Sequence, residues 1–213
     1  MILNIFKEKN WTSFDVVAKV RGILGEKKVG HAGTLDPLAE GVLIVLTGKD
    51  TKKQSEFMGM EKEYVAEFGL GLDSKTYDLE VLPHTVDSNI NFEEKLKKYV
   101  GRIKQKVPPY SALKVKGKTL YKEARKGNID ETKLPVKEIT IHRIDILDKY
   151  EVELETDLGF KVVSIVKAKI VCSSGTYIRS LAHDLDSVLV SLVRTRIGDY
   201  KVEDSVRVSE LKR

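Results

Sequence analysis

The chain has 213 residues, of which 41% are hydrophobic and 32% are charged. This composition excludes a disordered tail, a collagen-like repeat and a small disulfide scaffold. The formal net charge of +5 is compatible with a polyanionic partner without requiring one. One cysteine excludes an internal disulfide, and no apolar run reaches the about 20 residues of a membrane helix. We expect a monomeric cytoplasmic protein with no membrane partner, formed by a single domain over residues 1–213.

Hydrophobic spacing and capping residues predict the secondary structure. The expected elements are, in chain order, a strand at 2–6, a helix from Thr12 or Ser13 to Leu24, a strand at 42–46 covered on both faces, a helix at 49–58, a strand at 64–68, a helix at 92–103, strands at 139–150 and 161–171, and a helix at 176–185. The strands are neither segregated from the helices nor strictly alternating with them. The order therefore predicts an α+β fold with a mixed, largely antiparallel central sheet flanked by helices and loops.

The loop GHAGTLDP is the most informative segment of the first half. Gly30 and Gly33 permit tight backbone paths, and Pro37 biases Asp36 towards an extended conformation. The Asp36 carboxylate is then held at a defined point, as a nucleophile or general base requires. Asp before Pro is also a common start of a helical turn, in which Asp36 is simply a cap. Both interpretations stay open.

The segment CSSGTYIR is the second informative stretch. Arg179 falls in the first turn of the helix expected at 176–185, where the helix dipole does not favour a cation. A nearby carboxylate or phosphate would explain it, and an exposed position on a solvated face is the alternative. Tyr64 alternates onto the core face of its strand, and Cys172 ends an apolar strand, as expected for a buried, unreactive thiol.

No metal or nucleotide site is expected. Four scattered histidines and one cysteine lack metal-ligand spacing. A phosphate-binding loop is excluded because Asp50 stands where such a loop needs Ser or Thr. The region from Lys104 to Gly127 is different, since Lys and Arg far outnumber its single Glu. It is either a surface for a polyanionic partner or a solvated run of charge.

Four of these segments, in this order, resemble the TruB family of tRNA pseudouridine synthases. They are GHAGTLDPLAEGVLIVLTGKDTK, KEYVAEFGLG, VPPYSALKVKGKTLYKEARKG and CSSGTYIRSLAHDL. The resemblance implies a pseudouridine synthase fold and isomerisation of the T-loop uridine, position 55, of tRNA. Its partner is then the T arm of tRNA. The reaction is redox-neutral and hydrolyses nothing, so no cofactor and no metal is expected.

The resemblance also assigns residue roles. Asp36 is the implied nucleophile, Tyr64 stacks on the target base, and Arg179 pairs with Asp36 and keeps it ionised. The implied substrate-lining residues are His31, Tyr177 and Leu192, with His31 entering the space that the flipped base leaves. A basic thumb at about residues 104–130 is expected to contact RNA phosphates. Its contacting residues are Lys114, Lys116, Lys118, Lys122 and Arg125.

The sequence departs from the family pattern in three places. The segment after Leu185 is shorter than usual, residues 72–81 lack a common glycine although Asp78 is retained, and the sequence ends at Arg213 without a PUA-type domain. From the third departure we expect weaker tRNA affinity than in relatives that carry the PUA-type domain, without loss of the chemistry. The alternative function is a non-catalytic RNA-binding or tRNA-folding protein that retains the fold. A guide-dependent enzyme acting on another RNA is a third, less favoured hypothesis.

Overall fold

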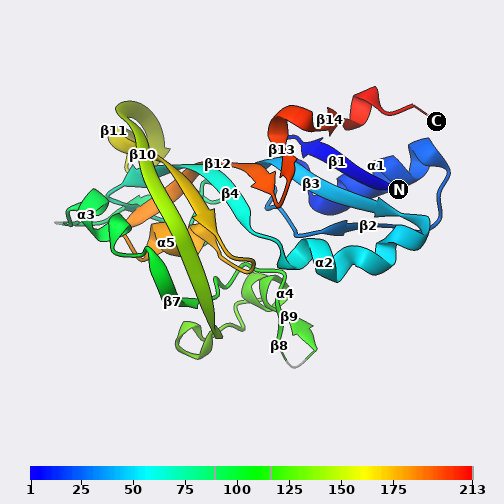
Figure 1. Cartoon of the computed structure of the whole chain (residues 1–213). Helices are drawn as coiled ribbons and strands as arrows, with labels where there is room; N and C mark the ends of the chain where they lie inside the picture. The colour runs from blue at the N-terminus through cyan, green and yellow to red at the C-terminus, as the bar shows by residue number, and fades with distance from the viewer. Residues whose placement is uncertain (89, 116, 213) are drawn as a thin grey trace. The chain divides into compact units, whose positions relative to one another are not determined.

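A computed structural model describes residues 1–88, 90–115 and 117–212 (Figure 1). The chain divides into two compact units. The first unit comprises Met1–Val65, Ile170–Ser174 and Ser191–Arg213, and the second comprises Ala66–Lys169 and Gly175–Val190. Three strands contribute residues to both units: β4 (Lys62–Leu70), β11 (Gly159–Cys172) and β12 (Ser187–Ile197).

The first unit contains a mixed sheet with strand order β14–β1–β3–β12, in which β2 also pairs with β3 and β13 with β12. Its further elements are β1 (Ile2–Lys7), α1 (Ser13–Leu24), β2 (Val29–Ala32), β3 (Glu40–Thr47), the 3-10 turn η1 (Gly48–Lys53), α2 (Gln54–Gly59), β13 (Tyr200–Lys201), η3 (Val202–Asp204), β14 (Val206–Arg207) and η4 (Val208–Glu210). β1 runs antiparallel to β3, whereas β12 runs parallel to it. This parallel pair brings residues near the C-terminal end of the sequence beside Glu40 and Gly41.

Helix α1 begins and ends where its local sequence predicts. The Thr12 hydroxyl accepts a hydrogen bond from Asp15 N at 3.1 Å, and the Asp15 carboxylate accepts one from Thr12 N at 2.8 Å. Such a reciprocal box satisfies backbone donors that a helix start leaves unpaired. Gly25, with φ 64°, ends the helix in the left-handed conformation that glycine adopts without strain.

Strand β3 is buried on both faces, as the apolar run at 42–46 predicts. Val42, Ile44 and Leu46 pack with Phe57 of α2 in one cluster. Leu43 and Val45 pack on the other side, in a cluster that includes Ile5, Val16 and Val20. Burying side chains of this size contributes about 1.5–3 kcal/mol each, so β3 is the centre of this unit's core.

The second unit is built on the order β12–β4–β11–β10–β7, with two short hairpins outside this order. Its further elements are β5 (Leu72–Asp73), β6 (His84–Thr85), α3 (Phe92–Lys97), β7 (Gly101–Lys106), β8 (Lys114–Val115), β9 (Lys118–Thr119), α4 (Leu120–Arg125), η2 (Glu131–Lys133), β10 (Val136–Thr156) and α5 (Ile178–His183). Figure 1 shows β10 and β11 as two long neighbouring ribbons. The prediction of an α+β fold with a mixed, largely antiparallel sheet is confirmed.

The helix expected at 92–103 is wrong in its second half. α3 ends at Lys97, and β7 begins at Gly101, whose φ is 116°. Residues 102–106 alternate between exposed and inward positions and pair antiparallel with β10. Of the apolar residues that suggested one helical face, Phe92 and Leu96 lie in α3, whereas Tyr99 and Val100 lie in the turn before β7.

Two predicted helices differ slightly in their bounds, and several elements were not predicted from the sequence: β2, the short strands β5, β6, β8, β9, β13 and β14, helix α4, and the long strand β12. The region 49–58 begins as a 3-10 turn before α2, and α5 begins at Ile178 rather than Thr176. β12 was not predicted at all, although it contributes to the sheet of each unit. Cys172 ends β11 and is fully buried.

Among the described residues, no helix is both long and apolar enough to cross a membrane. The His, Cys, Asp and Glu side chains of this part of the chain form no group of three or more that could hold a metal ion.

Candidate functional site

Asp36 lies in the loop between β2 and β3, here called the Asp36 loop (residues 33–39), and is half-buried. Its backbone carbonyl accepts a hydrogen bond from Ala39 N at 3.1 Å, and β3 begins immediately afterwards at Glu40. The chain therefore makes one turn at this point and then enters the core strand. The turn expected after Asp36 is therefore present, but no helix follows it.

The Asp36 loop is anchored on each side of Asp36. Ser13 Oγ donates to the Leu35 carbonyl at 3.1 Å and accepts from Leu35 N at 2.9 Å. On the other side, the Pro37 carbonyl accepts from Asn10 N at 2.8 Å and from Lys7 Nζ at 3.2 Å. Both neighbours of Asp36 are thus held by α1, β1 and the turn between them. A catalytic carboxylate needs such a fixed backbone, because catalysis depends on accurate placement.

Lys7 is a buried cation at this site. Its ammonium group also donates to the carbonyls of Glu8 and Trp11, at 3.0 and 2.6 Å. Burial lowers the pKa of Lys7 to about 8, against the opposing charges of Asp36 and Glu40. The lysine therefore supplies hydrogen bonds to the loop and positive charge near the carboxylate.

Tyr64 projects from β4 in the same unit and is only 8% exposed. Burial raises the pKa of the Tyr64 hydroxyl, while the charge of Arg194 and a hydrogen bond from it act in the opposite direction. The charge of Asp36 also acts on this hydroxyl. Tyr64, Arg194 and Asp36 therefore form one electrostatically coupled group in the first unit.

His31 lies on β2, two residues before the Asp36 loop. Its ring meets the Phe14 ring edge-on at 5.5 Å, and Phe14 itself is 74% exposed. Burial lowers the pKa of His31, and the charge of Arg194 adds to this effect, so the ring is neutral near pH 7. Among the described residues, no side chain or backbone group hydrogen-bonds its buried Nδ1.

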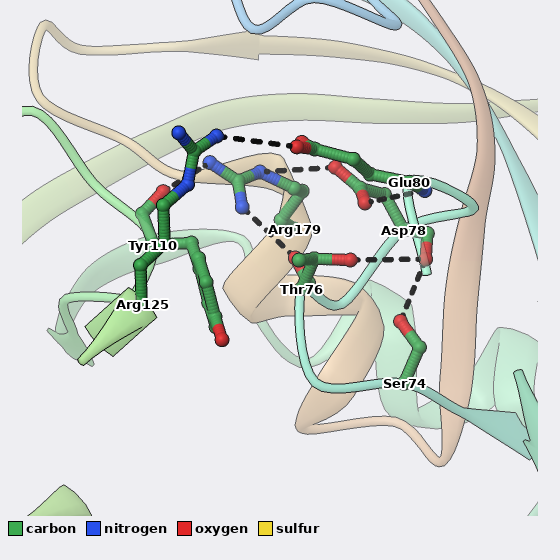
Figure 2. A network of polar contacts seen from close by, with 7 residues as sticks. All are labelled: Ser74, Thr76, Asp78, Glu80, Tyr110, Arg125 and Arg179. Atoms are coloured by element: carbon green, nitrogen blue, oxygen red, sulfur yellow. Dashed lines mark hydrogen bonds and ion pairs between the residues drawn. The ribbon is translucent and has the colours of Figure 1, made fainter. Parts of the chain in front are cut away.

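Arg179 is the centre of a buried polar network in the second unit (Figure 2). It donates from Nη1 to the Thr76 carbonyl at 2.8 Å and from Nη2 to the Tyr110 carbonyl at 2.9 Å. Its Nε lies 3.6 Å from Oδ2 of Asp78. The alternative of an Arg exposed on a solvated face is therefore wrong.

Asp78 is itself held in place around this contact. Its Oδ1 accepts from Glu80 N at 3.0 Å, and its backbone carbonyl accepts from Ser74 Oγ at 2.6 Å, as Figure 2 shows. From the sequence, Asp78 was identified only as an acidic residue that the family pattern retains. In the structure it forms an ion pair with Arg179. Asp36 belongs to the first unit and Arg179 to the second, so the ion pair expected between them stays a prediction.

Tyr177 and Leu192 have well-defined positions. The Gln105 side chain makes two hydrogen bonds with the backbone of Tyr177. Its Nε2 donates to the Tyr177 carbonyl at 3.0 Å, and its Oε1 accepts from Tyr177 N at 2.8 Å. This pair fixes the residue just before α5, and thereby the start of the helix that carries Arg179. Leu192 lies on β12 in the first unit and is nearly buried.

The described basic residues that are expected to contact RNA lie on the two short strands β8 and β9 and on helix α4. Lys114, Lys118, Lys122 and Arg125 are all exposed. Lys116 lies outside the described residues. Beneath these elements, Val107, Leu120 and Leu134 form a small buried cluster. The segment therefore has its own apolar support, with the charged side chains directed to solvent.

The sequence interpretation missed three residues that shape the site: Lys7, Ser13 and Arg194. Lys7 and Arg194 are fully buried or nearly so, although charged side chains are normally exposed. Ser13 was considered only as a helix cap. No local pattern marks such residues, because their partners lie far away in the sequence.

Comparison with known proteins identifies the family that the sequence matches. The model of the TruB family pseudouridylate synthase, N-terminal domain, matches residues 21–178. Proteins named tRNA pseudouridine synthase B from Phocaeicola vulgatus and Parabacteroides distasonis are each 41% identical to this chain. The matches cover 97% and 99% of this chain and 89% and 91% of those proteins.

Solved structures agree with the fold. A Cbf5–Nop10–Gar1 complex matches 99% of this chain with a TM-score of 0.69 and 27% identity. An H/ACA ribonucleoprotein bound to a substrate RNA containing 2′-deoxyuridine matches with a TM-score of 0.65 and 25% identity. This chain spans about half of each of those structures' chains, 53% and 51%. From the family match over most of the sequence and the close relatives, the chain belongs to the TruB family of pseudouridylate synthases.

Proposed function

We propose that this protein isomerises the T-loop uridine at position 55 of tRNA to pseudouridine, with Asp36 as the nucleophile. The observation that carries the proposal is the placement of Asp36, between two anchored residues and in electrostatic contact with Tyr64 and Arg194. Relatives with 41% identity that carry the name tRNA pseudouridine synthase B support tRNA as the substrate.

The reaction needs little beyond what these residues supply. The N1–C1′ bond of the uridine breaks, a C5–C1′ bond forms, and the hydrogen on C5 is replaced by one on N1. Substrate and product have the same composition, so no oxidant, reductant or water is consumed. Asp36 stabilises the separated base and sugar by adding to base C6 or to C1′, or by acting beside a glycal intermediate. All three routes place the same carboxylate at the same point.

The remaining site residues bind and position the uridine. In the proposal, Tyr64 stacks on the target base, and His31 enters the stack at the place that the base leaves. A neutral His31 ring suits this role, because an uncharged aromatic ring stacks without the cost of desolvating a cation. Arg179 pairs with Asp36, while Tyr177 and Leu192 line the site.

We assign tRNA affinity to the basic thumb at about residues 104–130, within a single catalytic domain. In the proposal, these residues of the thumb contact phosphates of the T arm, and their exposure supports this: Lys114, Lys118, Lys122 and Arg125. Neutralising phosphates releases counterions, so this contribution weakens as salt concentration rises. We place the reaction in the cytoplasm, carried out by a monomer.

The test is pseudouridine formation in an unmodified tRNA transcript, with wild type compared with Asp36→Asn. This change keeps the side-chain size and removes the nucleophilic charge. The matched control is Asp199→Asn, which makes the same change at an exposed residue of the same unit. We expect turnover by wild type and by the control, and loss of at least about a thousandfold with Asp36→Asn at unchanged tRNA affinity.

Other outcomes separate the proposal from its alternative. Tight tRNA binding without turnover by wild type would favour the non-catalytic RNA-binding function. Equal turnover by wild type and Asp36→Asn would remove Asp36 from the chemistry.

A further inference from the structure

We propose that Arg194 is a positioning residue that fastens both ends of the Asp36 loop. The inference rests on the proposed function, in which Asp36 acts on the uridine. Arg194 lies on β12, far from the loop in sequence, and is only 1% exposed. A buried arginine is costly unless its guanidinium group is fully engaged, so its partners indicate what it does.

The guanidinium group binds one carbonyl at each end of the loop. Its Nη2 donates to the carbonyl of Gly33, the first residue of the loop, at 3.0 Å. Its Nε donates to the carbonyl of Val42, just after the loop has entered β3, at 2.8 Å. One rigid planar group therefore fixes the separation of the two backbone points between which Asp36 lies.

The backbone of Arg194 makes a second close contact with the same segment. Arg194 pairs in parallel register with Gly41. A Cβ added to Gly41 would lie 3.0 Å from both N and C of Arg194, and closer still to its carbonyl oxygen. Gly41 also has φ 100°, a value that other residues adopt only with strain. Only glycine lets the strand carrying the arginine approach this closely.

The charge of Arg194 acts on two proposed site residues. The charge of its guanidinium group acts on the Tyr64 hydroxyl, to which Arg194 also donates a hydrogen bond, and the charge of Asp36 acts on Arg194. The anchors from Ser13 and Lys7 hold the residues beside Asp36, whereas Arg194 holds the loop ends. Arg194 thus adds a third anchor to the loop, and its charge interacts with that of Asp36 within the same unit.

The geometry requires an arginine specifically. A lysine would keep the charge but carries one compact ammonium group on a flexible stem, which does not present two donors in a fixed plane. A methionine would keep much of the volume and remove both the charge and the donors. Arg194→Lys therefore tests whether the planar pair of donors is needed in addition to the charge. Arg194→Met tests whether a side chain that only fills the space is sufficient.

The matched control is Arg196→Met on the same strand. Arg196 donates to the Gly198 carbonyl at 2.8 Å and forms an ion pair with Glu61 at 2.6 Å, both in the first unit. Arg196→Met therefore loses a comparable set of contacts, none of which involves the Asp36 loop. Each variant is measured for tRNA affinity, for the single-turnover rate of pseudouridine formation with enzyme in excess, and for amide hydrogen exchange in residues 33–42.

We expect Arg194→Met to lower the single-turnover rate about a hundredfold and Arg194→Lys about tenfold, because small misplacement of a reacting group has effects of this size. The dissociation constant for tRNA stays within about twofold, which separates positioning from binding. Exchange in residues 33–42 rises in Arg194→Met and stays at the wild-type rate in Arg196→Met.

Three results would overturn the proposal: a wild-type rate with Arg194→Lys, equal rates with Arg194→Met and Arg196→Met, or a loss confined to tRNA affinity. If Arg194→Met does not fold, Arg194→Lys decides. If wild type itself makes no pseudouridine, the proposed function fails. The exchange measurement then still decides whether Arg194 holds the loop.

Discussion

Asp78→Asn removes the negative charge from the buried ion pair in Figure 2 while preserving the shape of the side chain. The Asp78 and Arg179 side chains are 4% and 5% exposed, with 3.6 Å between Oδ2 and Nε. Breaking such a pair from one side costs about 3–5 kcal/mol, because the remaining charge stays buried without this counter-charge. The carbonyls of Thr76 and Tyr110 still accept from Arg179, so we expect the lower end of this range.

The assay is urea unfolding near neutral pH, followed by circular dichroism. A loss of about 3 kcal/mol corresponds to a fall in Tm of about 6–12 °C for a chain of this length. The matched control is Asp145→Asn, whose largely exposed ion pair with Arg143 spans 2.7 Å. Exposed pairs contribute about 0–1 kcal/mol, so the control changes stability little.

A loss with Asp78→Asn no larger than that of the control would refute this reasoning. A double substitution provides a further check. Asp78→Leu with Arg179→Met leaves no charge buried, so it is expected to be more stable than Asp78→Leu alone. If the double variant is the less stable of the two, the buried charge is not the cause of the loss.

The other predictions concern stability in the first unit. Lys7 and Lys62 each have a pKa of about 8 in the folded chain, below the ordinary value of 10.5, with burial as the main cause. The unfolded chain holds these protons more tightly, so the free energy of unfolding rises with pH between about 8 and 10.5. Lys7→Met reduces this rise, which urea unfolding at each end of the window measures; an unchanged rise contradicts the assignment. Gly41→Ala places a Cβ against the Arg194 backbone and destabilises by several kcal/mol, about 3 or more. Gly22→Ala, inside α1 with no atom within 4 Å of the added Cβ, stabilises by up to about 1 kcal/mol. Thermal unfolding of both variants tests the contrast, and shifts of the same sign would contradict it.

Local signals in the sequence were sufficient for α1 and β3 near Asp36, but not for β2, which was not predicted. The Thr12 cap, the apolar run of β3 and the glycines before Asp36 each depend on neighbouring residues, so they can be read directly from the sequence. The continuous helix expected at 92–103 failed for a related reason. Its apolar spacing fits a helix locally, but the pairing of β7 with β10 decides the structure of its second half.

The partners of the buried charges could not be predicted. Arg194 meets the carbonyls of Gly33 and Val42 only because β12 lies beside β3, and β12 itself was not predicted. Asp78 meets Arg179 across about a hundred residues of sequence, as does the Thr76 carbonyl. Such contacts arise from topology, and a charged residue in the sequence is by default expected at the surface.

Cys172 offers a practical consequence of its position at the buried end of β11. With 0% of the residue exposed, the native thiol reacts with maleimides or disulfide reagents only when its surroundings open. A cysteine introduced at exposed Lys118 would therefore take up a fluorescent label alone, giving a reporter on the basic thumb without removal of the native thiol. In the unlabelled protein, the slow modification of Cys172 would itself report the free energy of opening under native conditions.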